Sequence, residues 1–429
     1  MTARTTPTAS DFTSDQQRDP AIGGLKWAFV LVGVADATLL PFLPLYLFER
    51  GFDAPLIGVV LAAAALASLV AGLGWAYLTD HGVRPERMVV VASAATAAVA
   101  VLFVLPAGVA ALGAVTVALA VARSPFMLLD PIALQRLMSA RRTAYARIRL
   151  RMSAGWTVSA VMSGAAFQVV GLRLIPFLYV PLVALFGLWV RHALNPVPGT
   201  PRVHLDLAST GARVPRLPLA LIGFLASCLL LGAASAAAQN FVVLRINFLG
   251  GGALLIGAAA AFQALTEIPT MGYTHVLTRR LSHRALYAVG CGIFLVVFLT
   301  WAFVTDPLAV ALMKLVAGVG FALTYVGMVM IADELSPPHL RATGQALVKA
   351  AMFGLSPVAG TVGGGLIYGA FGSRAMFLAA TAIAGVAGLV ALLAIPARNR
   401  AAQRPDVATG DINMGDGVLP GSEPAPAIP

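Results

Sequence analysis

The stretch "LVGVADATLLPFLPLYL", Leu31–Leu47, decides the fold, because it is apolar enough to lie in lipid and yet carries Asp36 in its middle. Apolar runs of ~20 residues, the length that crosses a ~30 Å hydrocarbon core as a helix, recur along the whole chain. They are centred near Asp36, Leu66, Ala97, Leu119, Val161, Ala184, Leu230, Ala264, Val296, Val319, Val358 and Val386. The sequence therefore predicts an all-α membrane protein with twelve transmembrane helices.

The composition supports this class. Of the 429 residues, 59% are hydrophobic and only 11% are charged. A soluble domain of this length needs far more charge to cover its surface, so the lipid bilayer is the expected surrounding. Cys228 and Cys291 both fall in apolar runs and the histidines lack the spacing of a metal site, so neither a metal nor another cofactor is expected.

The net charge of +11 could suggest nucleic acid, but the basic residues lie between alternate apolar runs and lack the interleaved aromatics of a nucleic-acid surface. The basic loops hold Arg136, Arg141, Arg142, Arg147, Arg149 and Arg151; Arg191, Arg202, Arg213 and Arg216; Arg279, Arg280 and Arg284; and Arg398, Arg400 and Arg404. The other loops hold single arginines, Arg50, Arg173, Arg245 and Arg374. The positive-inside rule then places both termini in the cytoplasm, which fits a bacterial inner membrane.

The expected organisation is two six-helix bundles between polar tails. Residues 1–23 are a predicted disordered cytoplasmic tail without the pattern of a signal peptide, 24–192 the first bundle, 193–217 a cytoplasmic linker, 218–397 the second bundle and 398–429 a second disordered tail. The halves are alike: "GLGWAYLTDHGVRPER" at 72–87 and "MGYTHVLTRRLSHR" at 271–284 both run from glycine and an aromatic to threonine and a basic turn. Two such repeats around a midplane site are the architecture of secondary transporters.

Charged residues inside the spans are the candidate site, because a charge at a helix centre costs about 2.5–3.5 kcal/mol on insertion scales. Asp36 lies ten residues beyond Lys26, and Arg123 lies about thirteen residues into the fourth span from the opposite side. Their depths differ by only ~5 Å at 1.5 Å per residue. We expect the two side chains to face each other across the cavity of the first half, in contact with substrate or proton. The alternative is a structural ion pair that never titrates.

Asp130 follows Arg123 by seven residues, so both are expected on the same helix face, which suggests a ladder of substrate contacts. Equally, Asp130 could simply end the span and pair with loop arginines. In the second half, Lys314 and Lys349 are two of the only three lysines, and lysine is the base whose protonation responds most readily to burial. We predict a pair between Glu267 and Lys349, although chance placement of the lysines is the alternative.

Amide side chains add hydrogen-bonding capacity to the second half. Gln239 and Asn240 are adjacent in the seventh span, and Gln263 lies in the eighth. A single amide in a span often serves only to join helices. The adjacent pair favours a site without deciding it.

Three stretches resemble one family. They are "LPFLPLYLFERGFDAPLIGVVLA" at 40–62, "PFMLLDPIALQRLMSARRTAYARIRLRMSAGW" at 125–156 and "SPPHLRATGQALVKAAMFGLSPVAGTVGGGLIYGAFGSRAMF" at 336–377. They are similar to the major facilitator superfamily, and specifically to the branch with lactose permease and the 3-phenylpropionate-type permeases. The likeness spans roughly Gly24 to Ala394. It implies a transporter whose halves rock about a central site.

The resemblance also assigns residues. It implies that Asp130 and Arg149 form the branch's carboxylate–arginine pair, and that Trp156 stacks on a ring of the substrate. Lys314 matches a lysine of the tenth span. Asp80 and Arg84 match the gating loop between the second and third spans, although His81 and Ala76 depart from its pattern.

The residues of proton coupling differ from those of lactose permease. Ala317 and Gly320 stand where that permease keeps a histidine and a glutamate for proton coupling. A proton would therefore have to be carried by Asp36, Asp130 or Glu267. The lactose-permease mechanism itself is not expected.

The sequence thus predicts a monomeric secondary active transporter rather than an enzyme, because no acid–base or metal constellation lies at one membrane face. Proton-coupled symport of a small organic solute is the favoured function, with an organic anion that has an aromatic or apolar body as its substrate. Symport of a nucleoside or sugar, proton-driven efflux of an amphipathic compound, and a transporter-like receptor are the alternatives.

Overall fold

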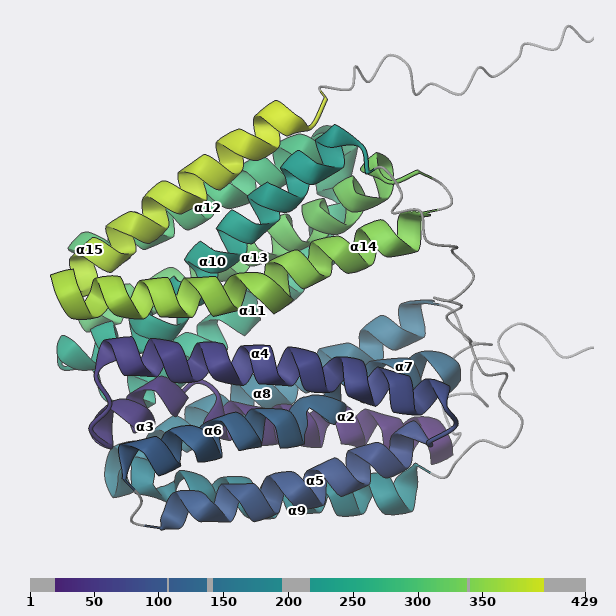
Figure 1. Cartoon of the computed structure of the whole chain (residues 1–429), viewed down its shortest axis with the longest axis vertical. Coiled ribbons are helices and arrows are strands. Elements are labelled where there is room, and N and C mark those ends of the chain that lie inside the picture. Colours follow the sequence, from purple (N-terminus) through teal and green to yellow (C-terminus); the bar gives the residue numbers. More distant parts are fainter. Residues whose placement is uncertain (1–19, 106–107, 137–141, 195–216, 338–339, 397–429) are drawn as a thin grey trace, which may run out of the picture. The chain divides into compact units, whose positions relative to one another are not determined.

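The computed structural model describes residues 20–105, 108–136, 142–194, 217–337 and 340–396. The predicted tails 1–19 and 397–429, most of the linker and several loop arginines lie outside the described residues. Within the described part every regular element is a helix, so the predicted all-α fold is confirmed (Figure 1).

The first half consists of helices that contain the predicted span centres. They are α2 (Pro20–Leu39), α3 (Leu43–Glu49), α4 (Ala54–Asp80), α5 (Pro85–Val101), α6 (Val109–Arg123), α7 (Leu129–Arg136), α8 (Arg142–Val170) and α9 (Ile175–Ala193). Short 3₁₀ turns, η1 (Leu102–Val104), η2 (Ser124–Leu128) and η3 (Leu172–Leu174), continue or connect them. The predicted first span is divided into α2 and α3, since Pro44 at the start of α3 has no backbone N–H for an unbroken ladder.

The second half is built in the same way. Its helices are α10 (Leu219–Phe248), α11 (Ala253–Arg280), α12 (His283–Phe303), α13 (Pro307–Leu335), α14 (Arg341–Lys349) and α15 (Ser356–Ala394). A π-helical segment, η5 (Ala350–Leu355), joins α14 to α15.

Ten helical segments of the described part are long and apolar enough to cross a membrane. The last, Thr343–Ala394, has 52 residues, a straight length of ~78 Å at 1.5 Å per residue and far more than one crossing needs. The chain turns back at Gly372, whose φ is 81°. Glycine adopts this left-handed conformation with little steric strain. α8 has 29 residues and is also long enough to cross, but arginines occupy its first turns. These segments are compatible with the twelve expected helices.

The two halves repeat the same contacts. In the first, Arg50 donates to the carbonyl oxygen of Phe103 at 2.8 Å, which ties the end of the first span to the end of the third. In the second, Arg245 of α10, the seventh span, donates to the carbonyl oxygen of Val304 at 3.1 Å. This ties α10 to the end of α12, the ninth span. The internal repeat inferred from short sequence motifs thus extends to side-chain contacts.

Four glycines in the left-handed region lie at the same end of the two halves, and a fifth, Gly82, lies at the opposite end of the first half. Gly51 and Gly250 follow the first span of each half, and Gly171 and Gly372 follow the fifth. We call this end the outer end. The opposite end, where α2 begins, is the inner end.

The halves touch each other along α4 and α15 at the outer end. A Cβ at Gly58 would collide with the carbonyl oxygen of Thr361, and one at Gly365 would lie 2.6 Å from the carbonyl oxygen of Ala54. The two backbones therefore approach as closely as small residues allow.

A second contact joins α8 to α11, also at the outer end. A Cβ at Gly164 would lie 2.7 Å from the carbonyl oxygen of Ala253, and one at Gly257 would collide with that of Ala160. Nearby, Leu254 donates its backbone N–H to Oε1 of Gln168 at 3.3 Å. Small residues and backbone thus dominate these two contacts, and the Gln168 side chain adds a hydrogen bond to the second.

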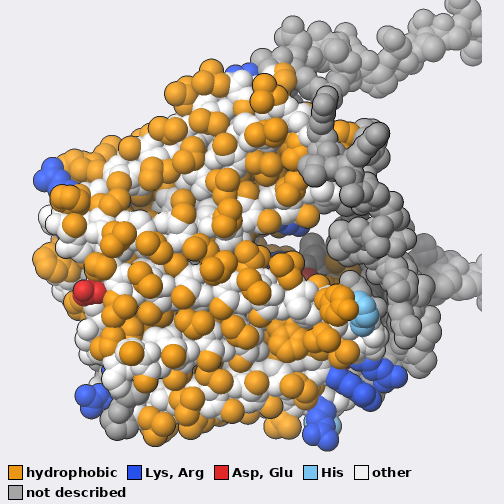
Figure 2. Space-filling view, viewed as in Figure 1, with side chains coloured by type: hydrophobic (Ala, Val, Ile, Leu, Met, Phe, Trp, Pro, Cys, Tyr) orange, Lys and Arg blue, Asp and Glu red, His pale blue; other side chains and the backbone are white. Residues whose placement is uncertain are grey.

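Toward the inner end the halves separate. Contact along α4 continues to Leu69, whose side chain lies 3.4 Å from where a Cβ of Gly354 would be. One turn further, a Cβ at Gly72 would meet only Met127 of its own half, and one at Gly74 would meet nothing within 4 Å. The surface is hollowed between the two halves (Figure 2). We call this hollow the recess.

The outer-end contacts can be tested with single methyl groups. We expect Gly58→Ala and Gly365→Ala to lower the melting temperature in detergent, because overpacking costs about 1–3 kcal/mol. Gly74→Ala on α4 and Gly363→Ala on α15 are matched controls, since a Cβ at either position has nothing within 4 Å. Equal melting temperatures for all four variants would contradict the proposed packing.

Candidate functional site

Asp36 and Arg123 form an ion pair inside the first half. A guanidinium N–H of Arg123 donates to Oδ1 of Asp36 at 2.7 Å. The side chain of Asp36 is 8% exposed and that of Arg123 is 23% exposed. The contact expected from their depths in the two spans is present, whereas a role in substrate or proton binding stays a prediction.

The packing of α2 on α8 positions Asp36. Gly33 lies so close to α8 that a Cβ there would collide with the carbonyl oxygen of Met152. Thr38 lies 3.2 Å from both Ser159 and Ser163, oxygen to oxygen, which adds hydroxyl contacts between the same two helices. α2 is therefore held firmly against α8, and its carboxylate is directed to α6.

Arg123 keeps further hydrogen-bonding capacity. The buried Tyr179 of α9 lies beside its guanidinium. Within the described residues, neither the Tyr179 hydroxyl nor Nε of Arg123 has a hydrogen-bond partner. The ion pair is thus compensated in charge but incompletely hydrogen-bonded.

Asp130 and Arg149 form a second pair nearer the inner end. Both carboxylate oxygens accept from one nitrogen of Arg149, at 2.8 and 2.7 Å. The side chains are 37% and 52% exposed, respectively. This is the partnership that the family resemblance implied, and the carboxylate does contact an arginine.

Asp130 and Arg123 do not lie on one unbroken α-helix. The 3₁₀ segment η2, Ser124–Leu128, separates them, and its three residues per turn change the angle between their side chains. Arg123 contacts α2, whereas Asp130 contacts α8. The shared face predicted from a spacing of seven therefore does not hold for this segment.

Glu267 does not pair with Lys349, so that prediction is wrong. Among the described residues, no cation lies within ion-pair distance of the half-buried Glu267, and Lys349 is exposed at the end of α14. The cation whose charge acts on Glu267 is Arg149, across the packed helices α8 and α11. Depth in the bilayer predicted the height of Glu267 but not the direction in which it points.

Lys314 lies in a cluster of neutral groups in the second half. It is 7% exposed, and its ammonium group donates to Oε1 of Gln239 and, at 3.2 Å, to Oε1 of Gln263. Nζ also lies 5.6 Å from the centre of the Trp301 ring, within the range of a cation–π contact. Among the described residues no carboxylate lies within ion-pair distance of it.

Close helix packing brings this cluster together. A Cβ at Gly318 would collide with the carbonyl oxygen of Gln263 and with Oγ1 of Thr266. Thr266 also donates to the carbonyl oxygen of Leu315 at 2.6 Å. α13 therefore lies directly on α11, and Lys314, one turn before Gly318, meets the amide of Gln263.

The remaining predicted residues fall in different places. Asn240 donates to the carbonyl oxygen of Ala236 on its own helix at 2.8 Å, so of the adjacent amides only Gln239 reaches Lys314. Trp156 is half-buried on α8, two turns beyond Arg149. No ring contact or hydrogen bond of its side chain occurs in the described part of the chain, which leaves the indole open to a ligand.

The gating loop is only partly described. The side chain of Asp80 lies outside the described residues, and Arg84 is exposed just before α5. At this inner end Arg136 instead pairs with Glu86 at 3.0 Å, and their side chains are 5% and 14% exposed. The sequence gives no signal for this pair, because both residues lie beside loops where charged residues are common.

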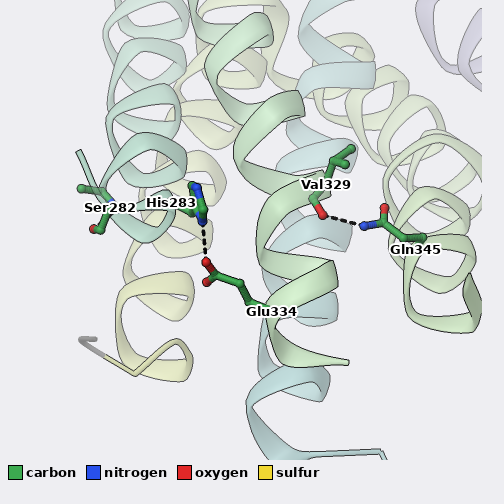
Figure 3. Close-up of polar contacts among 6 residues, drawn as sticks. Ser282, His283, Val329, Glu334 and Gln345 are labelled. Atoms are coloured by element: carbon green, nitrogen blue, oxygen red, sulfur yellow. Dashed lines mark hydrogen bonds and ion pairs between the residues drawn. The ribbon is translucent and has the colours of Figure 1, made fainter. Parts of the chain in front are cut away.

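The inner end of the second half has its own polar contacts (Figure 3). Nδ1 of His283, at the start of α12, lies 2.5 Å from Oε1 of Glu334, near the end of α13. On the other side of α13, Gln345 of α14 donates to the carbonyl oxygen of Val329 at 2.6 Å. These contacts join neighbouring helices within one half.

The chain matches the family model described as "MFS_1 like family" over residues 25–379. None of the curated proteins matches the sequence. Because the match covers most of the chain, this protein belongs to the MFS_1 like family, a group within the superfamily that the sequence resembles. Family and fold together define a multi-pass membrane transporter rather than an enzyme.

Solved structures share the fold at low sequence identity. A point mutant of the nucleoside transporter NupG is 16% identical with a TM-score of 0.75, over 88% of this chain and all of that chain. A POT family transporter bound to a thioalcohol-conjugated peptide is 13% identical, with a TM-score of 0.70 and coverage of 87% and 95%. A D-xylose-proton symporter is 14% identical, with a TM-score of 0.63 and coverage of 88% and 96%. Since these proteins differ in what they carry, the shared fold does not choose a substrate.

The ion pair of Asp36 can be tested by removing one or both partners. We expect Asp36→Asn to lower the melting temperature markedly, since breaking a buried pair costs about 3–5 kcal/mol. The double variant Asp36→Asn with Arg123→Gln should recover much of the loss, because no buried charge is left alone.

The control is Asp130→Asn, whose exposed pair should contribute only about 0–1 kcal/mol. Thermal unfolding in detergent measures all three. If Asp36→Asn melts like the unchanged protein, the buried pair does not stabilise the fold.

Proposed function

We propose that this protein moves a small organic solute across the membrane by rocking its two halves about the recess, and that proton symport drives the movement. One observation carries the proposal: the halves touch through small residues at the outer end and separate toward the inner end, where charged side chains lie in the spans. This is the arrangement of one end state of alternating access.

The outer-end interfaces suit a movement that must be reversed. They consist of backbone packed on backbone, at Gly58 against Thr361 and at Gly257 against Ala160, with no ion pair between the halves among the described residues. Such contacts can separate without leaving a charge unpaired in lipid. The opposite end state would close α4 on α14 at the inner end.

Among the three carboxylates in the spans, Glu267 is the best proton carrier. Asp36 and Asp130 each lie 2.7 Å from an arginine nitrogen, so protonating either one would break an ion pair. Glu267 has no such pair to lose, yet it lies within the electrostatic reach of Arg149 on the other half. Its proton can therefore be linked to the approach of the two halves.

Sidedness and substrate belong to the same proposal. The basic loops favour a cytoplasmic inner end, and a monomer in a bacterial inner membrane is part of the proposal. After an organic anion, a nucleoside or a sugar is the second candidate substrate. The unstacked Trp156 offers a flat apolar face. Similar folds include a nucleoside transporter and a D-xylose-proton symporter. Proton-driven efflux of an amphipathic compound would use the same recess in the opposite direction.

The test is uptake into proteoliposomes of a panel of labelled organic acids, nucleosides and sugars, with and without an inward proton gradient. Accumulation of one class only under the gradient is the expected result. If the folded protein accumulates nothing under either condition, the symport proposal is wrong. Efflux or binding without transport would then be examined.

Glu267→Gln separates coupling from movement. We expect this variant to lose gradient-driven accumulation at least tenfold while keeping exchange of labelled for unlabelled solute, which needs no net proton transfer. The control is Glu49→Gln, the same chemical change at an exposed residue of the outer end. Full accumulation by Glu267→Gln would show that Glu267 does not carry the proton and would leave Asp36 or Asp130 as the carrier.

A further inference from the structure

We infer that Lys314, together with the amides of Gln239 and Gln263, forms a subsite for an anionic group of the transported solute, with a carboxylate as its occupant. The inference rests on the proposed function, because it identifies the charge of the solute and the half of the protein that holds it. Four observations support it: the missing counter-ion, the free amide donors, the comparison with the first half and the access to the cluster.

The first observation is a buried lysine amino group without a counter-ion. Lys314 is 7% exposed, and only neutral groups, the two amide oxygens and the Trp301 ring, surround its ammonium group in the described structure. A buried charge is stable only when it is paired or well hydrogen-bonded. Two amide acceptors and one ring satisfy its hydrogen bonds in part and leave its charge uncompensated.

The second observation concerns the two glutamines. An ammonium group only donates hydrogen bonds, so the amide oxygens of Gln239 and Gln263 must face Lys314 and their NH₂ groups must face away from it. No hydrogen bond from either NH₂ group occurs in the described part of the chain. The cluster therefore offers two amide donors beside a cation, which is a set of groups that a carboxylate can satisfy.

The third observation is the comparison with the other half. The fourth span carries a cation, Arg123, that faces a carboxylate, Asp36, on the first span. At the corresponding helices of the second half, Lys314 on the tenth span faces Gln239 on the seventh. The same arrangement thus recurs with an amide in place of the carboxylate, and a carboxylate brought by the solute would complete it.

The fourth observation is access. Lys314 is buried, but Gln239 and Gln263 are only half-buried, so the amide side is the more exposed side of the cluster. Lys314 lies seven residues into α13 from the outer end, and Gln263 ten residues into α11. These positions correspond to ~10–15 Å of helix, which is near the depth of the bilayer midplane. A carboxylate bound there lies at the depth expected of a transported solute.

Binding to the purified full-length chain in detergent tests the subsite without any transport. The probes are monocarboxylates matched with their neutral amides: butyrate with butyramide, lactate with lactamide, and benzoate with benzamide. Affinity is measured by isothermal titration. We expect at least one carboxylate to bind at least tenfold more tightly than its own amide.

The variants locate the charge. Lys314→Gln should abolish the preference for carboxylate over amide, and Lys314→Arg should keep part of it. Lys349→Gln, the same change at an exposed lysine, should bind like the unchanged protein. If Lys314→Gln does not fold, Gln239→Leu and Gln263→Leu serve instead, and each should weaken the carboxylate at least threefold.

Two results would overturn the inference. One is that no carboxylate of the series binds more tightly than its amide. The other is that the preference persists in Lys314→Gln, or in both glutamine variants, which would make Lys314 a purely structural cation. A protein that binds carboxylates through Lys314 but accumulates none would instead overturn the symport proposal and leave the subsite intact.

Discussion

The need to compensate charge in an apolar interior controls this structure. The chain is 11% charged, and the charged side chains that lie deep in its helices each solve the same problem in a different way. Asp36 and Arg123 neutralise each other at 2.7 Å, whereas Lys314 relies on amides and a ring. Arg123 thus has its counter-ion within the chain, whereas the proposed subsite gives Lys314 a counter-ion from the solute.

Small residues provide the second constraint, because they determine which helices can meet. Gly318 lets α13 lie on α11 and so brings Gln263 to Lys314, and Gly33 lets α2 lie on α8 beside the Thr38 hydroxyl contacts. The polar site and the close packing are thus produced by the same short stretches. Bulk at either glycine would displace the polar groups as well as the helices.

The depth of a residue in the bilayer could be predicted from the sequence, because helix geometry alone determines it. The direction of its side chain could not be predicted in the same way. The rise per residue in a helix is fixed, so the depths of Asp36 and Arg123 could be calculated and their contact expected. The same calculation gave the height of Glu267 but not its direction, and it pointed to Lys349 rather than Arg149. A 3₁₀ segment between Arg123 and Asp130 leaves no clear mark in the sequence, and for that reason the predicted common face was wrong. Gln239, Gln263 and Lys314 are each recognisable as candidates in the sequence. The contact between Lys314 and Gln263 depends on the close packing of α13 on α11 at Gly318, which the sequence does not reveal.

The outer-end interfaces also bear on how fast the molecule can change state. Where Gly58 lies against Thr361 and Gly257 against Ala160, backbone carbonyl oxygens of one half face the glycines of the other. Contacts of this kind are weak and short-ranged, so the helices can turn over one another without unlocking rotamers. In the proposed rocking step, the activation barrier would then arise mainly from moving charged groups through the apolar interior. The rate would accordingly depend on the state of those charges far more than on the area of the interfaces.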